Sequence, residues 1–203
     1  MKQTWLKRMH VHGHENLEWA QAKNKGILFL TLHMGNGDLG CALLALQGLR
    51  VHLISKKFKL SWLNKLWFDV RSKMGTQFIE PHGKQSSFAI LNALKNKEIV
   101  IFVMDQYMGR PFGVETEFFG RKTGSAYGLA LFALKTKAPV LPVYTFRDQH
   151  NIAQIFFEKP IELEELDDRD KTLQHMTQKY NDKLQEIICA HPGQWMWLHR
   201  RWK

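Results

Sequence analysis

The sequence predicts an α/β fold in one domain, with a mainly parallel central sheet flanked by helices. Short apolar runs rich in large residues alternate with segments of helical spacing, which is the pattern of strand–helix–strand units. The chain has 203 residues, 44% of them hydrophobic, which suffices for one core, and no Pro-, Gly- or Ser-rich linker divides it. We therefore expect residues 1–203 to form a single domain, with residues 1–25 as a polar lead-in and residues 191–203 as a Trp- and Arg-rich tail.

The individual elements follow from local pattern. Apolar runs bounded by Gly, Pro, Asp or charged residues predict strands over residues 27–32, 50–55, 76–80, 98–104, 140–146 and 152–157. Apolar residues at helical spacing predict helices over residues 15–22, 39–49, 56–75, 84–97, 125–137 and 169–190. Residues 112–124 mix polar and aromatic side chains and are expected to form a loop, and residues 148–151 a tight connection between two strands.

The loop after the first predicted strand holds the strongest candidate site. The strand ends at His33, two glycines follow, and Asp38 caps the next helix or lies in its first turn. The loop can fold the two side chains together. An imidazole that donates one ring proton to a carboxylate keeps its other nitrogen free as a general base. A satisfied histidine beside a helix-capping aspartate, with no chemistry, explains the local pattern equally well.

The central strand over residues 98–104 ends in a second candidate carboxylate, Asp105, followed by Gln106. If this strand runs parallel to the one before His33, both side chains emerge at the same carboxyl edge of the sheet, where open α/β folds bind their ligands. The alternative for Asp105 is a carboxylate that caps a loop.

Basic residues at two further places could bind an anionic group of a substrate. Arg71, near the end of the helix over residues 56–75, has a guanidinium fork that can grip a phosphate. Arg121 and Lys122 precede the helix over residues 125–137, and a helix amino terminus behind basic residues is a ready anion site. Ser125 is not the middle residue of a G-x-S-x-G turn, which argues against a serine hydrolase.

Bulk composition restricts the partners. The formal net charge of +10 favours an anionic partner, which can be nucleic acid, an anionic bilayer or an acidic protein. Only Cys41 and Cys189 are present, without C-x-x-C spacing, which indicates neither a disulfide framework nor a zinc cage and fits a reducing cytoplasm. We find no secretory signal and no apolar run that could span a bilayer, so we expect any membrane contact to be peripheral.

Three segments leave alternatives open. The helix over residues 56–75 combines bulky residues with Lys56, Lys57, Lys59 and Lys65, so it either lies on an anionic membrane or packs on the core with solvated lysines. The tail, with Trp195, Trp197 and Trp202 among cations, suits a bilayer interface, single-stranded nucleic acid or a strap over the core, the strap being favoured for the first two. His10, His12 and His14 alternate as on a strand face, but no ligand-spaced Cys or carboxylate cluster accompanies them, so we expect no metal.

Four ordered stretches resemble a known family. The first is HMGNGD, a His-x4-Asp motif from His33 to Asp38, and the second is VRSKMG, with Arg71 before Gly75. The third is VMDQYMGR followed by FFGR and a small-residue helix, and the fourth is the closing HPGQWMWLHRRWK. Together they resemble the lysophospholipid acyltransferases, most closely the bacterial lipid A branch of lauroyl and myristoyl acyltransferases, over nearly the whole chain. Members of this branch often carry Glu where Asp38 stands. They also usually begin with a membrane-spanning helix, for which this sequence shows no apolar run.

The resemblance implies a function. The chain would transfer a fatty acyl group from a thioester of acyl carrier protein or coenzyme A to a hydroxyl of a lipid or glycolipid, as in lipid A biosynthesis. His33 would be the general base, oriented by Asp38, in a direct attack that needs neither a covalent enzyme intermediate nor a metal or cofactor beyond the acyl thioester. Residues that bind substrate would be Arg71, Asp105, Gln106, Arg121 and Lys122.

The same resemblance implies a location and leaves one rival. A bacterial enzyme of this kind would be cytoplasmic and peripheral on the inner face of the cytoplasmic membrane, with an anionic membrane surface as partner. The rival is a basic module that binds nucleic acid or lipid without catalysis. No RRM, KH or helix-turn-helix pattern supports nucleic-acid binding, and it leaves the pairing of His33 with Asp38 unexplained, so we expect no nucleic-acid partner.

Overall fold

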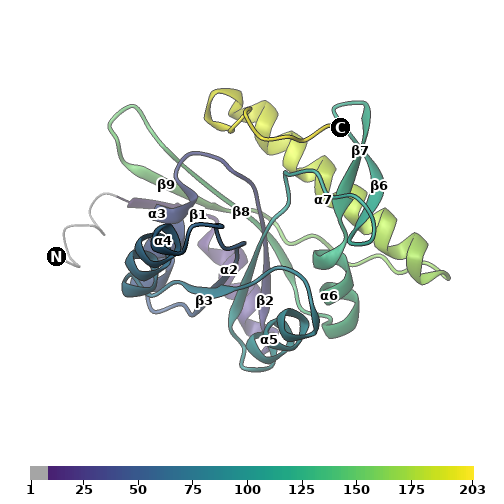
Figure 1. The fold of residues 1–203 in the computed structure, drawn as a ribbon, viewed down its shortest axis with the longest axis horizontal. Helices are drawn as coiled ribbons and strands as arrows, with labels where there is room; N and C mark the ends of the chain where they lie inside the picture. The colour runs from purple at the N-terminus through teal and green to yellow at the C-terminus, as the bar shows by residue number, and fades with distance from the viewer. Residues whose placement is uncertain (1–8) are drawn as a thin grey trace.

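The computed structural model describes residues 9–203 and has a central seven-stranded sheet (Figure 1). The strand order is β1-β9-β8-β2-β5-β3-β4, and neighbouring strands run parallel except for the antiparallel pair β8 and β9. The strands are β1 (Met9–His12), β2 (Ile27–Thr31), β3 (Val51–Ile54), β4 (Gln77–Ile79), β5 (Ile99–Val103), β8 (Val140–Arg147) and β9 (Ala153–Phe157). This arrangement confirms the predicted α/β fold with a mainly parallel sheet.

Helices cover both faces of this sheet, because its central strands are apolar on both sides. Ile27 and Phe29 of β2 pack with α2 and α3, whereas Leu28 and Leu30 pack with α5, α6 and α7 on the opposite face. The helices of the described residues are α2 (His14–Ala22), α3 (Gly37–Leu46), α4 (Ser61–Lys73), α5 (Lys84–Lys95), α6 (Gly128–Thr136) and α7 (Arg169–Ala190). None of these helices combines the length and apolar character needed to cross a bilayer.

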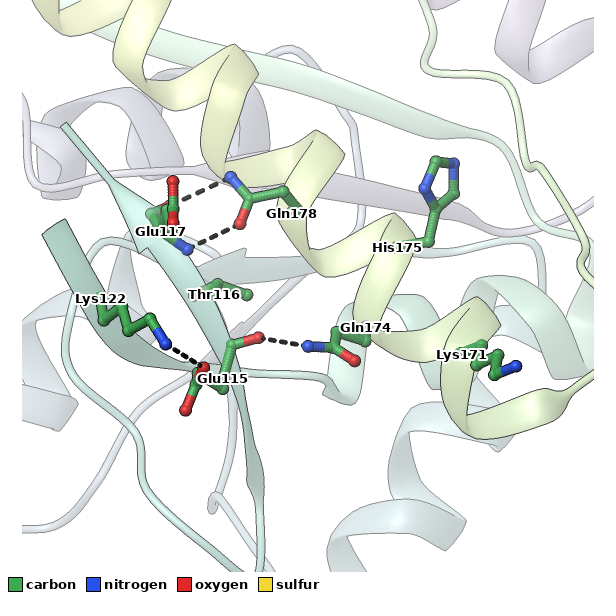
Figure 2. Close-up of a pocket in the computed structure, with 8 residues that line it drawn as sticks. All are labelled: Glu115, Thr116, Glu117, Lys122, Lys171, Gln174, His175 and Gln178. Atoms are coloured by element: carbon green, nitrogen blue, oxygen red, sulfur yellow. Dashed lines mark hydrogen bonds and ion pairs between the residues drawn. The ribbon is translucent and has the colours of Figure 1, made fainter. Parts of the chain in front are cut away.

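A separate hairpin replaces the loop expected over residues 112–124. Strands β6 (Gly113–Phe118) and β7 (Arg121–Ala126) pair antiparallel, and the helix expected from residue 125 begins only at Gly128. The outer edge of β6 is occupied by α7: Gln174 Nε2 donates to the Glu115 carbonyl at 3.1 Å, and Gln178 accepts from the backbone N–H of Glu117 at 2.7 Å (Figure 2). A two-stranded hairpin is unstable alone, so this long-range pairing, invisible in the local sequence, decides its structure.

The amino-terminal segment contains a strand where a lead-in was predicted. β1 adds to the sheet edge by parallel pairing with β9, and residues 1–8 of the predicted lead-in lie outside the described residues. Its histidines have separate partners: His12 bonds Gln154 at 2.7 Å, and His14 of α2 pairs with Glu18 at 3.2 Å. Within the described part of the chain, no three His, Cys, Asp or Glu residues group as a metal site.

The tail returns across the sheet to the hairpin, where the C-terminus lies in Figure 1. Trp195 is buried with 4% of its surface exposed, whereas Trp197 is 57% exposed, so the predicted strap over the core is confirmed for the first and wrong for the second. Arg201 is fully buried against the Phe118 ring and donates to the Gly124 carbonyl at 2.9 Å and to Ser125 Oγ at 2.7 Å. Burial lowers the pKa of Arg201 to about 10.

The loop between β2 and α3 generates a stability prediction. Gly35 has a φ of +55°, and a Cβ there would meet the Thr145 carbonyl oxygen at 2.5 Å, so Gly35→Ala should lower the free energy of unfolding by at least about 1 to 3 kcal/mol. Gly37→Ala is the matched control, because nothing lies within 4 Å of a Cβ at that position. Urea unfolding followed by circular dichroism measures both; equal losses would contradict the close approach of this loop to β8.

Candidate active site

His33 and Asp105 meet at the carboxyl edge of the sheet. β2 and β5 are parallel neighbours with Thr31 opposite Val103, so the residues just beyond each strand emerge side by side. His33 Nδ1 lies 2.7 Å from Asp105 Oδ1, and the backbone N–H of His33 donates to Asp105 Oδ2 at 2.9 Å. The Asp105 side chain is fully buried, and the His33 side chain is 31% exposed. The structure thus brings together the two residues that strand topology predicts at one edge.

Asp105 is held as a carboxylate by its hydrogen bonds. Burial by itself raises the pKa of Asp105, but the hydrogen bond and charge of His33 and the hydrogen bond from Trp195 Nε1, at 2.8 Å, outweigh it. The pKa of Asp105 therefore lies below its usual range. A carboxylate accepts hydrogen bonds only, so Nδ1 of His33 carries the ring proton, and Nε2 is the acceptor available to a substrate.

Asp38 is not the carboxylate partner of His33, which corrects the sequence expectation. Asn36 caps α3, which places Asp38 in the first turn, where it faces α4. Arg71 of α4 grips it with two nitrogens, Nε donating to Oδ1 at 2.7 Å and Nη2 to Oδ2. Position in a helical turn, rather than nearness in sequence, thus decides where this carboxylate points.

Arg71 has its guanidinium occupied in this arrangement. Besides its two bonds to Asp38, Nη1 donates to the Trp67 carbonyl at 2.9 Å, and the guanidinium carbon stacks 3.4 Å from the centre of the Trp67 ring. The free fork that the sequence suggested for a phosphate is therefore engaged with a carboxylate. Its evident effect is to tie α4 to α3, the helix that follows the His33 loop.

Gln106 and the tail add a second histidine beside the first. Gln106 Nε2 lies 3.2 Å from His199 Nδ1, and the His199 ring centre lies 4.1 Å from that of His33. Burial, together with the charge of His33, lowers the pKa of His199 below its usual range. Neither His199 nor Trp195 is predicted as a site residue, because the sequence pattern of the tail is aromatic and basic and does not indicate what the tail contacts.

Arg121 and Lys122 do not lie at a helix amino terminus, which corrects the expected anion site there. Both belong to β7, and α6 begins only at Gly128. Lys122 pairs with Glu115 at 3.4 Å, and Arg121 lies 5.7 Å from the centre of the Trp202 ring. The error follows from the missed hairpin, since the strand between these cations and α6 separates them from the helix dipole.

A cavity of about 470 Å³ lies between β6 and α7 (Figure 2). Its lining is polar and of mixed charge, and it includes neither His33 nor Asp105. A second cavity, of about 380 Å³, lies by Glu98 and Ile99 at the start of β5, which is the opposite edge of the sheet from the dyad. These cavities are thus separate from the His33 site.

Cys41 is the thiol nearest to this chemistry in sequence. Burial, reinforced by the Asp38 carboxylate, raises the pKa of Cys41 to about 12. A thiol of that pKa stays protonated near neutral pH and is a poor nucleophile. The reactive geometry at this edge is therefore the His33–Asp105 dyad, which suits proton abstraction from a substrate hydroxyl.

Comparison with known proteins supports the resemblance seen in the sequence. The chain is 25% identical over 195 residues to a phosphatidylinositol mannoside acyltransferase of Mycobacterium tuberculosis, covering 95% of this chain and 59% of the relative. It is 26% identical over 197 residues to the lipid A biosynthesis lauroyltransferase of Escherichia coli, covering 95% and 61%. A lipid A biosynthesis acyltransferase of Haemophilus influenzae is 23% identical over 195 residues, covering 95% and 58%.

The chain thus spans about three fifths of the length of the relatives it matches. The family described as bacterial lipid A biosynthesis acyltransferase matches residues 1–203, the whole of the chain. With its full length inside that match, this protein belongs to the bacterial lipid A biosynthesis acyltransferase family.

Proposed function

We propose that this chain transfers a fatty acyl group from a thioester donor to a hydroxyl of a lipid or glycolipid acceptor. The observation that carries the proposal is the imidazole of His33, half-buried at the sheet edge with its Nδ1 held by the buried Asp105 carboxylate. The relatives named above, which act on lipid A or phosphatidylinositol mannoside by their descriptions, support the acceptor class. The donor is the thioester of acyl carrier protein or coenzyme A.

His33 performs the proton transfers in this proposal. Nε2 takes the proton of the acceptor hydroxyl as its oxygen attacks the thioester carbonyl, and the Asp105 carboxylate stabilises the resulting imidazolium. The new C–O bond forms, the C–S bond breaks, and the thiolate leaves with the proton returned by His33. The acyl group passes directly to the acceptor, and the buried Cys41 thiol takes no part.

Of the other predicted site residues, Gln106 lies next to the dyad through His199. Asp38 and Arg71 act by holding α3 and α4 together beside the His33 loop. Arg121 and Lys122 stay a prediction for contacts with an anionic part of the donor or acceptor, on the exposed face of β7.

The surface around α4 supports peripheral contact with a membrane. No residue of α4 is fully buried: Leu66, Trp67 and Val70 are exposed, whereas Phe68 is half-buried against Phe78 of β4. Large apolar side chains exposed on α4 and its flanks are Phe58, Leu60, Trp62, Leu66, Trp67, Val70 and Met74. Lys56, Lys57 and Lys59 precede the helix on the exposed surface. We propose that this surface docks on the anionic inner leaflet of the cytoplasmic membrane, next to the helix pair joined by Arg71 and Asp38.

His33→Ala should abolish transfer while leaving the fold intact, because the side chain lies at the edge of the core. General-base catalysis contributes a factor of about 10² to 10⁴ to the rate. Asp105→Asn should lower the rate of transfer by a comparable factor, because the amide cannot stabilise the imidazolium. The assay offers acyl carrier protein and coenzyme A thioesters with bacterial lipid extract, and new acyl lipids are read by mass spectrometry. Circular dichroism checks folding; a His33→Ala rate equal to wild type would refute the dyad.

Asp38→Asn and Arg71→Lys should each lower kcat/KM by a similar factor, short of complete loss, and the double variant should be little worse than either. The reason is that each change breaks the same bidentate pair, so their effects are not additive. Steady-state kinetics of the wild type, the two single variants and the double variant, with both substrates varied, measures these effects. Additive losses would contradict the shared pair. A KM for a phosphorylated substrate raised by Arg71→Lys alone would show instead that Arg71 binds phosphate.

Vesicles containing anionic lipid should bind the protein at low salt, and neutral vesicles should bind it poorly. Changing Lys56, Lys57 and Lys59 to Glu should weaken binding on the order of a hundredfold, at about 1 kcal/mol per cation near the surface. The charge-matched control changes Lys95, Lys97 and Lys135, exposed on other elements, to Glu. Co-sedimentation over a salt series with an oligonucleotide competitor measures both. Binding unaffected by the α4 changes, or displaced by the oligonucleotide, would contradict the proposed surface.

A further inference from the structure

The tail forms a strap over both halves of the dyad. On one side, Met34 and Trp195 form an antiparallel bridge, and the Met196 N–H donates to the carbonyl of His33 itself at 2.9 Å. On the other side, Tyr107, two residues beyond Asp105, donates its N–H to the Arg200 carbonyl at 3.0 Å. The backbone of the strap is therefore fixed to the loops that carry the base and its carboxylate.

Trp195 differs from the other tryptophans of the strap in what its indole N–H contacts. Trp197 Nε1 donates to the Pro192 carbonyl at 2.8 Å and Trp202 Nε1 to the Phe118 carbonyl at 3.1 Å. Trp195 Nε1 instead donates, at 2.8 Å, to Oδ2 of the fully buried Asp105 carboxylate. The indole is packed edge-on to Trp197, with ring centres 4.5 Å apart, and lies 6.1 Å from Phe118. Its N–H is therefore held on the carboxylate by packing on more than one side.

We infer that Trp195 is a positioning residue of the transfer reaction, which sets the base strength of His33 through Asp105. Its N–H draws negative charge toward Oδ2, and so reduces the stabilisation that Oδ1 gives to a protonated His33. It also restrains the carboxylate plane, since Oδ2 receives the His33 N–H and the indole N–H together. The inference rests on the proposed function, because it concerns the same base.

Other charged groups face this pair, and they bear on any pH profile. Two groups contact the His33 ring: Asp105, which lies just beyond β5, and the ring of His199, which belongs to the tail. Asp105 also feels the Arg201 cation at longer range, without a hydrogen bond between them in the described structure. These groups are unchanged in a Trp195 variant, so a shift can be assigned to the indole N–H.

Trp195→Phe removes the donor and keeps most of the buried ring. With the N–H gone, the Asp105 charge concentrates toward His33, protonated His33 becomes more favourable, and its pKa rises. The acid limb of the pH profile of kcat should therefore move to higher pH by roughly half a unit to one unit, with KM little changed. Trp202→Phe is the matched control, since it also loses one indole hydrogen bond, to a backbone carbonyl, and it should leave the limb in place.

A second variant guards against simple misfolding. Benzothienylalanine at position 195 keeps the bicyclic ring and replaces the N–H by sulfur, and it should give the same shift. The His33 ring pKa is measured directly by NMR of ¹⁵N-labelled protein, assigned with His33→Gln, and needs no turnover. If wild-type protein transfers no acyl group, the proposed function fails while this readout still tests the inference. An unmoved His33 pKa in the folded variants, or an equal shift in the Trp202 control, would overturn it.

Discussion

The hydrogen bond between His33 and the buried Asp105 carboxylate is the interaction on which the site depends. A fully buried carboxylate is costly unless its acceptors are satisfied, and here two N–H groups of His33 and one of Trp195 satisfy them. The donors come from two parts of the fold: the loop just beyond β2, and a tail that returns from the far end of the chain. The central sheet and the strap are therefore both needed to keep the carboxylate charged and the imidazole oriented.

The strap is in turn fixed by a second buried group. Arg201 is enclosed by the β6–β7 hairpin, where Ser125 Oγ and the Gly124 carbonyl accept from it and Phe118 covers its face. The hairpin is held by α7, whose glutamines occupy the free edge of β6. A chain of contacts thus runs from α7 through the hairpin and Arg201 to Trp195 and Asp105. This explains why a small antiparallel hairpin accompanies the mainly parallel sheet at this edge.

The pairing of Asp38 with Arg71 shows how a motif can be recognised and its internal contacts still be misassigned. The spacing of His33 and Asp38 pointed to a dyad, but the first turn of α3 directs Asp38 toward α4, and the carboxylate for His33 arrives from β5. Arg71 therefore joins α4 to α3 and places the exposed apolar and basic surface of α4 next to the His33 loop. Site and proposed docking surface are linked by one ion pair.

The sequence by itself determined the α/β class, most strands and helices, and the shared sheet edge of His33 and Asp105. These features follow from the periodicity of hydrophobic residues and from the positions at which apolar runs end. Both depend only on residues that are neighbours in the sequence. The strands over residues 9–12 and 113–126 were missed because β1 depends on β9, and the β6–β7 hairpin on α7, both distant in the chain. Tertiary structure alone decided which carboxylate holds His33, across 72 residues, and brought Trp195 to Asp105 across 90. Such contacts depend on strand order and on the return of the tail, and neither leaves a periodic signal in the residues concerned.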